Sequence, residues 1–87
     1  MRATKINLDY NPREQFGKDD RRGIFIFRNT HPTDTAYVQF GIPSNRDDGF
    51  PVLAGDTLTL DRGDLSQAIF IWTSTVAGNS TNNCLVG

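Results

Sequence analysis

The sequence predicts a small all-β protein, either an antiparallel β-sandwich or a jelly-roll-like barrel of about six to eight strands. Short apolar runs rich in β-branched and aromatic residues alternate with turn residues, and no stretch shows sustained helical periodicity. The clearest run is 57–61, where Leu58 and Leu60 alternate with polar residues after the Gly55-Asp56 turn. We expect the 87 residues to form a single domain, 1–87.

The first two predicted segments are a strand and a long connection. Ile6 and Leu8 alternate with polar neighbours, which predicts a strand over residues 4–8. Residues 11–23 are polar and mixed in charge, and we expect them to form a long loop. Loops of this length are usually functional or disordered in a compact domain. Phe16 lies in the middle of the loop as an apolar residue that can anchor it, on its own domain or on a neighbour.

The next two predicted strands are 24–27 and 36–41. Residues 24–27 are apolar at every position, so a strand here has two apolar faces. In 36–41 we expect inward and outward side chains to alternate, with Ala36, Val38 and Phe40 inward and Tyr37 and Gln39 outward. Turn residues separate the two strands, and we expect the strands to form a hairpin.

Two further strands are predicted towards the end of the chain. Residues 68–73 form a second strand with two apolar faces, with Ala68, Phe70 and Trp72 on one and Ile69 and Ile71 on the other. Residues 76–83 are small and polar and predict a turn, and residues 84–86 predict a last strand.

Strands with two apolar faces need more cover than a six-stranded sandwich supplies. Either the 11–23 loop or another copy of the chain must cover the surplus face. We favour another copy, because a chain of this size buries a limited core and has no intrachain disulfide. We therefore expect a homo-oligomer, with a trimer favoured. Its predicted interface consists of Phe16, Ile24, Phe25, Ile26, Phe27, Ile69 and Ile71.

Composition limits the kinds of partner and cofactor. Nine Lys and Arg residues against ten Asp and Glu residues give a net charge of −1, with neither sign in a long block. Nucleic acid is therefore not an expected partner. No apolar run approaches the length of a membrane span, and the first residues lack the apolar core of a signal peptide, so we expect neither membrane insertion nor export. One cysteine and one histidine exclude a structural zinc site built by one chain, and no cofactor is predicted.

The residues also predict that the chain is not an enzyme. His31, beside Pro32 in a turn, is interpreted as a surface side chain, and Cys84 as a small buried hydrophobe. The acid pairs at 47–48 and at 61 and 64 are interpreted as solvated turn residues. Segment 44–49 lacks the ligand pattern of a calcium loop, and a turn explains the Arg-Gly-Asp tripeptide at 62–64.

Four runs between residues 24 and 73 carry a family resemblance. They are Ile26-Phe27-Arg28-Asn29-Thr30 with Asp34, Tyr37-Val38-Gln39-Phe40-Gly41, Leu53-Ala54-Gly55-Asp56-Thr57-Leu58-Thr59-Leu60-Asp61 and Ala68-Ile69-Phe70-Ile71-Trp72. In these runs the chain resembles small bacteriophage virion proteins of the capsid decoration, or auxiliary capsid, type. The resemblance does not include the 11–23 loop. It implies a non-enzymatic structural protein of the virion, assembled in the bacterial host cytoplasm. Such a protein binds the major capsid protein or another virion protein as a homo-oligomer, and the interface residues named above would then contact either a second subunit or the capsid.

A second interpretation stays open. Similar sandwich domains occur as receptor- or carbohydrate-binding modules of phage tails and fibres. In that case Tyr37, next to the outward Gln39, is the candidate exposed aromatic contact, whereas Trp72 is expected in the core or in an interface.

Overall fold

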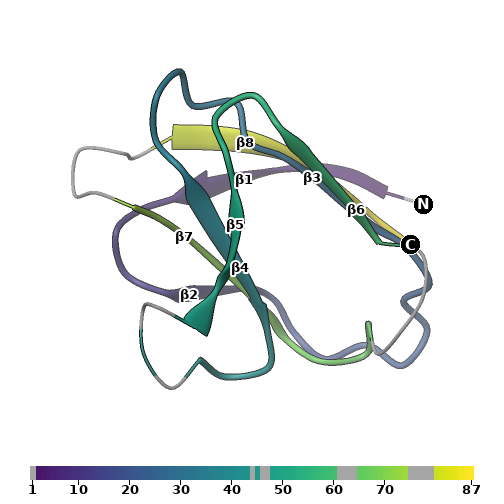
Figure 1. The fold of residues 1–87 in the computed structure, drawn as a ribbon. Coiled ribbons are helices and arrows are strands. Elements are labelled where there is room, and N and C mark those ends of the chain that lie inside the picture. Colours follow the sequence, from purple (N-terminus) through teal and green to yellow (C-terminus); the bar gives the residue numbers. More distant parts are fainter. Residues whose placement is uncertain (1, 44, 46–47, 61–64, 75–79) are drawn as a thin grey trace.

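A computed structural model describes the chain except for residues 1, 44, 46–47, 61–64 and 75–79. Within the described residues the chain folds into eight strands arranged in two antiparallel sheets, so the predicted small β-sandwich is confirmed (Figure 1). The strands are β1 (Arg2–Leu8), β2 (Arg13–Phe16), β3 (Phe25–Arg28), β4 (Ala36–Phe40), β5 (Phe50–Val52), β6 (Thr57–Leu60), β7 (Ile69–Thr73) and β8 (Ser80–Val86). Among the described residues, no helix is long and apolar enough to cross a membrane.

The two sheets contain four strands each. Sheet A has the strand order β1-β8-β3-β6, and sheet B has the order β2-β7-β4-β5. The two ends of the chain are neighbours in sheet A, since Arg2 pairs with Val86, and Figure 1 shows them on the same side of the molecule. Strand β1 is an edge strand of sheet A, and β2, the next strand in the sequence, is an edge strand of sheet B.

The hairpin predicted for residues 24–27 and 36–41 is wrong. Strand β3 pairs with β6 and β8 in sheet A, whereas β4 pairs with β5 and β7 in sheet B. The connection between β3 and β4 crosses from one sheet to the other. It has no tight two-residue turn of the kind that holds consecutive strands together.

Inward side chains of both sheets fill the interior. Phe25 and Phe27 of β3 and Ile69 and Ile71 of β7 are each 0% exposed. The alternation predicted for the other strands is also present, because Ala36 and Val38 are buried and Leu58 and Leu60 pack against the core. Phe25 lies at the centre of an aromatic group, with edge-on contacts to Phe16 and Phe40 at centroid distances of 6.4 and 5.6 Å.

Residues 11–23 are not one long loop, contrary to the sequence prediction. Arg13–Phe16 forms β2, which pairs with β7 and contains a register shift between Glu14 and Phe16. The sequence of this strand shows no alternation of apolar and polar residues, because Phe16 is its one apolar residue. Strand β2 lies at the edge of sheet B and pairs with β7 alone. Phe16 packs against the core of its own domain.

Arg22 fastens the segment after β2 to the rest of the domain. Its guanidinium group donates hydrogen bonds to three backbone carbonyl oxygens, at 2.7, 2.9 and 2.7 Å, those of Leu65, Gln67 and Gly17. The guanidinium carbon also lies 6.0 Å from the centroid of the Phe16 ring, within the range of a cation–π contact. The part of the chain that was predicted to be a long loop is therefore tied to its own domain.

We expect Arg22→Ala to lower the free energy of unfolding by about 2–4 kcal/mol, because three carbonyl oxygens lose a charged donor. Arg22→Lys should recover a minor part of this loss, since an ammonium group lacks the planar fork of a guanidinium. The matched control is Arg21→Ala, whose side chain is 92% exposed and which should change stability by less than about 0.5 kcal/mol. Urea denaturation measures all three, and equal losses for Arg21→Ala and Arg22→Ala would contradict this role for Arg22.

The chain itself covers Trp72 on the outer face of β7, while Phe70 on the same face is half-buried. Trp72 lies on this face and is 0% exposed. The ring of Tyr37, its register partner on β4, stacks on it with a centroid distance of 5.9 Å and an interplanar angle of 26°. Gly49 packs against the same indole ring. The predicted alternation in 68–73 is thus confirmed, and the cover over Trp72 comes from Tyr37 and Gly49.

Candidate functional site

The structure divides the residues of the predicted interface into two groups. Phe25, Phe27, Ile69 and Ile71 are in the core with no exposed surface, and Phe16 packs against them. Ile24 and Ile26 are half-buried. In this structure, therefore, Ile24, Ile26 and the half-buried Phe16 have some exposed surface, and the four core residues do not.

Ile26 belongs to an apolar row on the outer face of sheet A. The register places Ala3 of β1 beside Leu85 of β8, and Leu85 beside Ile26 of β3. Two cationic residues, Lys5 and Arg28, occupy the neighbouring row, and both are exposed. These residues line a hollow of about 610 Å³ on the sheet surface. An apolar row with cations beside it is a surface suited to binding protein.

A second surface is the groove between β1 and β2, the two edge strands joined by residues 9–12. The groove has a volume of about 720 Å³, and its lining consists of Thr4, Lys5, Ile6, Asn7, Leu8, Asp9, Arg13, Glu14, Gln15 and Phe16. Ile6 and Leu8 are buried at its floor, while its rim is polar. The groove lies at the open side of the sandwich, where the edges of the two sheets face each other.

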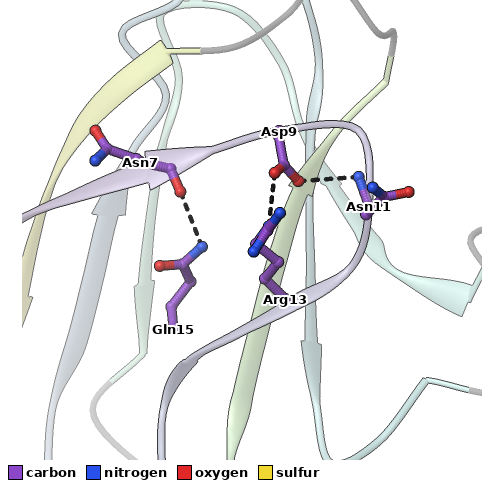
Figure 2. Close-up of polar contacts among 5 residues, drawn as sticks. All are labelled: Asn7, Asp9, Asn11, Arg13 and Gln15. Carbon is purple, nitrogen blue, oxygen red and sulfur yellow. Dashed lines mark hydrogen bonds and ion pairs between the residues drawn. The ribbon is translucent and has the colours of Figure 1, made fainter.

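Polar contacts cross this groove from β2 to β1 (Figure 2). The Nε2 atom of Gln15 donates a hydrogen bond of 3.1 Å to the backbone carbonyl oxygen of Asn7. Arg13 and Asp9 form an ion pair with 2.6 Å between Nε and Oδ2, and the other oxygen of Asp9 accepts from the backbone N–H of Asn11. The Arg13 side chain is 61% exposed, so water screens the ion pair and its contribution to stability is small.

His31 has a structural role that the sequence interpretation missed. It is half-buried, and its Nδ1 atom accepts hydrogen bonds from the backbone N–H groups of Thr33 and Asp34, at 3.1 and 2.8 Å. A side-chain acceptor bound to N–H groups two and three residues later is typical of a capped turn. His31 therefore stabilises the turn before β4. The one feature of the sequence that pointed to this role was the position of His31 among turn residues, between Asn29 and Asp34.

Cys84 is buried, with 2% of its surface exposed, as its interpretation as a small hydrophobe predicted. Burial raises the pKa of its thiol from an ordinary 9.0 to about 12. The thiolate is the reactive form of cysteine, so the folded protein holds this residue in its unreactive state.

Two results are expected from this burial. A thiol reagent near neutral pH should modify Cys84 in denatured protein and leave it unmodified in folded protein. Because the folded thiol keeps its proton to higher pH than the unfolded thiol, its contribution to stability is complete below pH 9. That contribution is then lost at about 1.4 kcal/mol per pH unit as the pH rises towards 12. Cys84→Ala should lack this slope in urea denaturation at alkaline pH, and an identical slope would contradict the assignment.

Several predicted features lie outside the described residues. These are Asp47, Asp61 and Asp64, half of the Ser44 to Gly49 segment, and the Arg-Gly-Asp tripeptide at 62–64. Within the described part of the chain, no group of three or more His, Cys, Asp or Glu side chains is placed to hold a metal ion. Tyr37, the candidate aromatic contact, is half-buried and has one ring face against Trp72.

No protein-family model, no curated protein and no solved structure matches the chain. The function is therefore inferred from the two surfaces described above, the outer face of sheet A and the groove between β1 and β2.

Proposed function

We propose that the chain is a non-enzymatic structural protein of a bacteriophage virion, a capsid decoration protein that binds the assembled shell as a homo-oligomer. The observation that supports this proposal most directly is the outer face of sheet A, where Ala3, Leu85 and Ile26 form an apolar row next to Lys5 and Arg28. The phage setting rests on the sequence resemblance described above. Binding of this kind needs a surface and no catalytic group.

The outer face of sheet A is the proposed contact between subunits. Ile26 and Leu85 are half-buried, so each gains additional burial when a second copy covers the row. The individual contacts are weak. A ring of copies, with a trimer favoured, engages several equivalent sites of a shell at once and so gains affinity through effective concentration.

Light scattering of the purified chain at low and high concentration tests the oligomer. We expect the mass of a trimer or larger ring, and we expect Ile26→Asp to give a monomer because a carboxylate would be buried in an apolar contact. Lys18→Asp, a charge change at an exposed loop position, is the control that should leave the mass unchanged. A wild-type chain that stays monomeric at high concentration would contradict the oligomer.

Removal of the chain from the virion tests decoration. In the phage that encodes it, we expect many copies per particle and particles that break more easily when the chain is absent. The alternative role, a receptor- or carbohydrate-binding module, predicts few copies and direct binding to a host glycan that Tyr37→Ala weakens. Tyr37 stacks one ring face on Trp72, so a glycan would have to bind its other face. Glycan binding without shell binding would overturn the decoration proposal.

A further inference from the structure

We propose that the free edge of β1 is a strand-addition site. Its occupant is an extended segment of a partner protein, with apolar residues at alternate positions and an acidic residue beside Lys5. The proposal uses the backbone edge of β1 and the groove next to it, and it holds whether or not the partner belongs to a phage shell.

The four edge strands differ in how well they are protected against such pairing. Strand β2 has a register shift, β5 has three residues including Pro51, and β6 has four residues. Strand β1 has seven residues, contains no proline and pairs with β8 in an unbroken register. Bulges, proline, short length and charged side chains, above all Lys, are the usual means by which sheets block further pairing. Strand β1 lacks the first three and carries Lys5, so an added strand needs an acidic residue opposite that lysine.

The contact of Gln15 identifies which backbone groups of β1 face the free edge. Its side-chain amide binds the carbonyl oxygen of Asn7, so the backbone groups of Asn7 point away from β8 and towards β2. In an antiparallel strand the same orientation recurs at every second residue, so Ala3 and Lys5 present their N–H and C=O groups to this edge as well. The Gln15 amide makes the hydrogen bond that the peptide N–H of an added strand would make. The register shift in β2 lies at Gln15 and directs its side chain across the groove (Figure 2).

The surroundings of β1 provide room on both faces of an added strand. On the inner side is the groove of about 720 Å³, with Ile6, Leu8 and Phe16 in its lining. On the outer side, Ala3 and Lys5 are exposed beside the free edge. Because side chains of a strand alternate between faces, an added strand would place alternate residues in the groove and the others on the outer side, next to Ala3 and Lys5.

The charge of the outer side defines the partner. Lys5 points to this side, and no carboxylate among the described residues forms an ion pair with it. An acidic residue opposite Lys5 would therefore pair with this cation, whereas Arg28 lies two strands further in, on β3. A second copy of β1 fits poorly, because antiparallel pairing over the full strand places Lys5 opposite Lys5 of the other copy, and like charges in that position are destabilising.

Binding of a synthetic peptide to the full chain tests the proposal. The probe is the extended peptide Val-Thr-Val-Glu-Val-Thr-Val, and the comparison peptide has Lys in place of Glu. We expect the Glu peptide to bind about tenfold more tightly, and Lys5→Glu to reverse the preference. Binding should slow the amide hydrogen exchange of Ala3 and Lys5, which NMR measures residue by residue.

Two variants separate strand addition from general adhesion. Ala3→Pro removes a backbone N–H at the free edge and no bond to β8, so it should weaken binding about tenfold, whereas Ala3→Val should not. If Ala3→Pro fails to fold, Gln15→Ala serves instead, because it vacates the Asn7 carbonyl oxygen and should tighten binding about threefold. Absence of binding at millimolar peptide would overturn the proposal. So would binding without slower exchange at Ala3 and Lys5, or equal binding by both peptides.

Discussion

Asn29→Asp should lower the free energy of unfolding by about 3–5 kcal/mol, although the two side chains have nearly the same shape. Asn29 is 1% exposed. Its Nδ2 atom donates to the carbonyl oxygens of Asp34 and Val52, each at 2.8 Å, and its Oδ1 atom accepts from the backbone N–H of His31 at 3.1 Å. Aspartate would place an oxygen opposite two carbonyl oxygens, which would lose their donor. It would also bury a charge that keeps one hydrogen bond, from the His31 N–H.

The position of Asn29 in the fold makes this loss serious. Its backbone N–H donates to the carbonyl oxygen of Asp56, and its own carbonyl oxygen accepts from Gly55, in the turn before β6. Its side chain meanwhile binds the end of β5 in sheet B. One residue therefore ties the end of β3 to β5, to the 53–56 turn and to the turn before β4. A small domain has about 5–15 kcal/mol of total stability, so this variant should be largely unfolded at modest denaturant concentration.

Urea denaturation followed by tryptophan fluorescence measures the effect. Asn7→Asp is the matched control, because Asn7 is exposed and the same exchange there should cost less than about 0.5 kcal/mol. A loss below about 1 kcal/mol for Asn29→Asp would mean that the buried amide does not hold the two sheets together.

The fold class was predictable because it depends on local patterns. The predicted alternation of inward and outward residues is present in β6 (Thr57–Leu60) and in β4 (Ala36–Phe40). Residues 24–27 are apolar throughout, and such a run does not say which side chains face the core. Phe25 and Phe27 face inward, and Ile26 faces outward. The predicted interface therefore combined core residues with surface residues.

The candidate surfaces were less predictable because they depend on strand order. The sequence predicts β1 as a strand but not as an edge, and the β1–β2 groove exists because two edges face each other. The role of Asn29 was hidden for a similar reason. It appears in the sequence as part of an Asn-Thr turn, but one of its side-chain partners, Val52, lies 23 positions away. Contacts of that range are set by the folded topology.

Gly49→Ala should lower the free energy of unfolding by about 2–3 kcal/mol. A Cβ atom at this position would lie 2.6 Å from the Cβ atom of Tyr37 and 2.7 Å from both Cη2 and Cζ2 of Trp72. Neither neighbour can move away easily. The Cβ atom of Tyr37 is fixed by the backbone of β4, and the indole of Trp72 is completely buried. The matched control is Gly17→Ala, where an added Cβ meets no atom within 4 Å and stability should be nearly unchanged.

A double-mutant cycle can show that the indole ring is the cause. Trp72→Phe removes the two ring atoms that the new Cβ would strike, and it also removes an indole N–H that is buried without a hydrogen-bond partner among the described residues. Because the clash with the indole is then absent and only that with the Tyr37 Cβ atom remains, adding Gly49→Ala to Trp72→Phe should cost at least about 1 kcal/mol less than adding it to the wild type. Additive losses would instead place the strain at Tyr37 or in the backbone. Circular dichroism is the suitable measurement, since Trp72 is the single tryptophan and its fluorescence is lost with it.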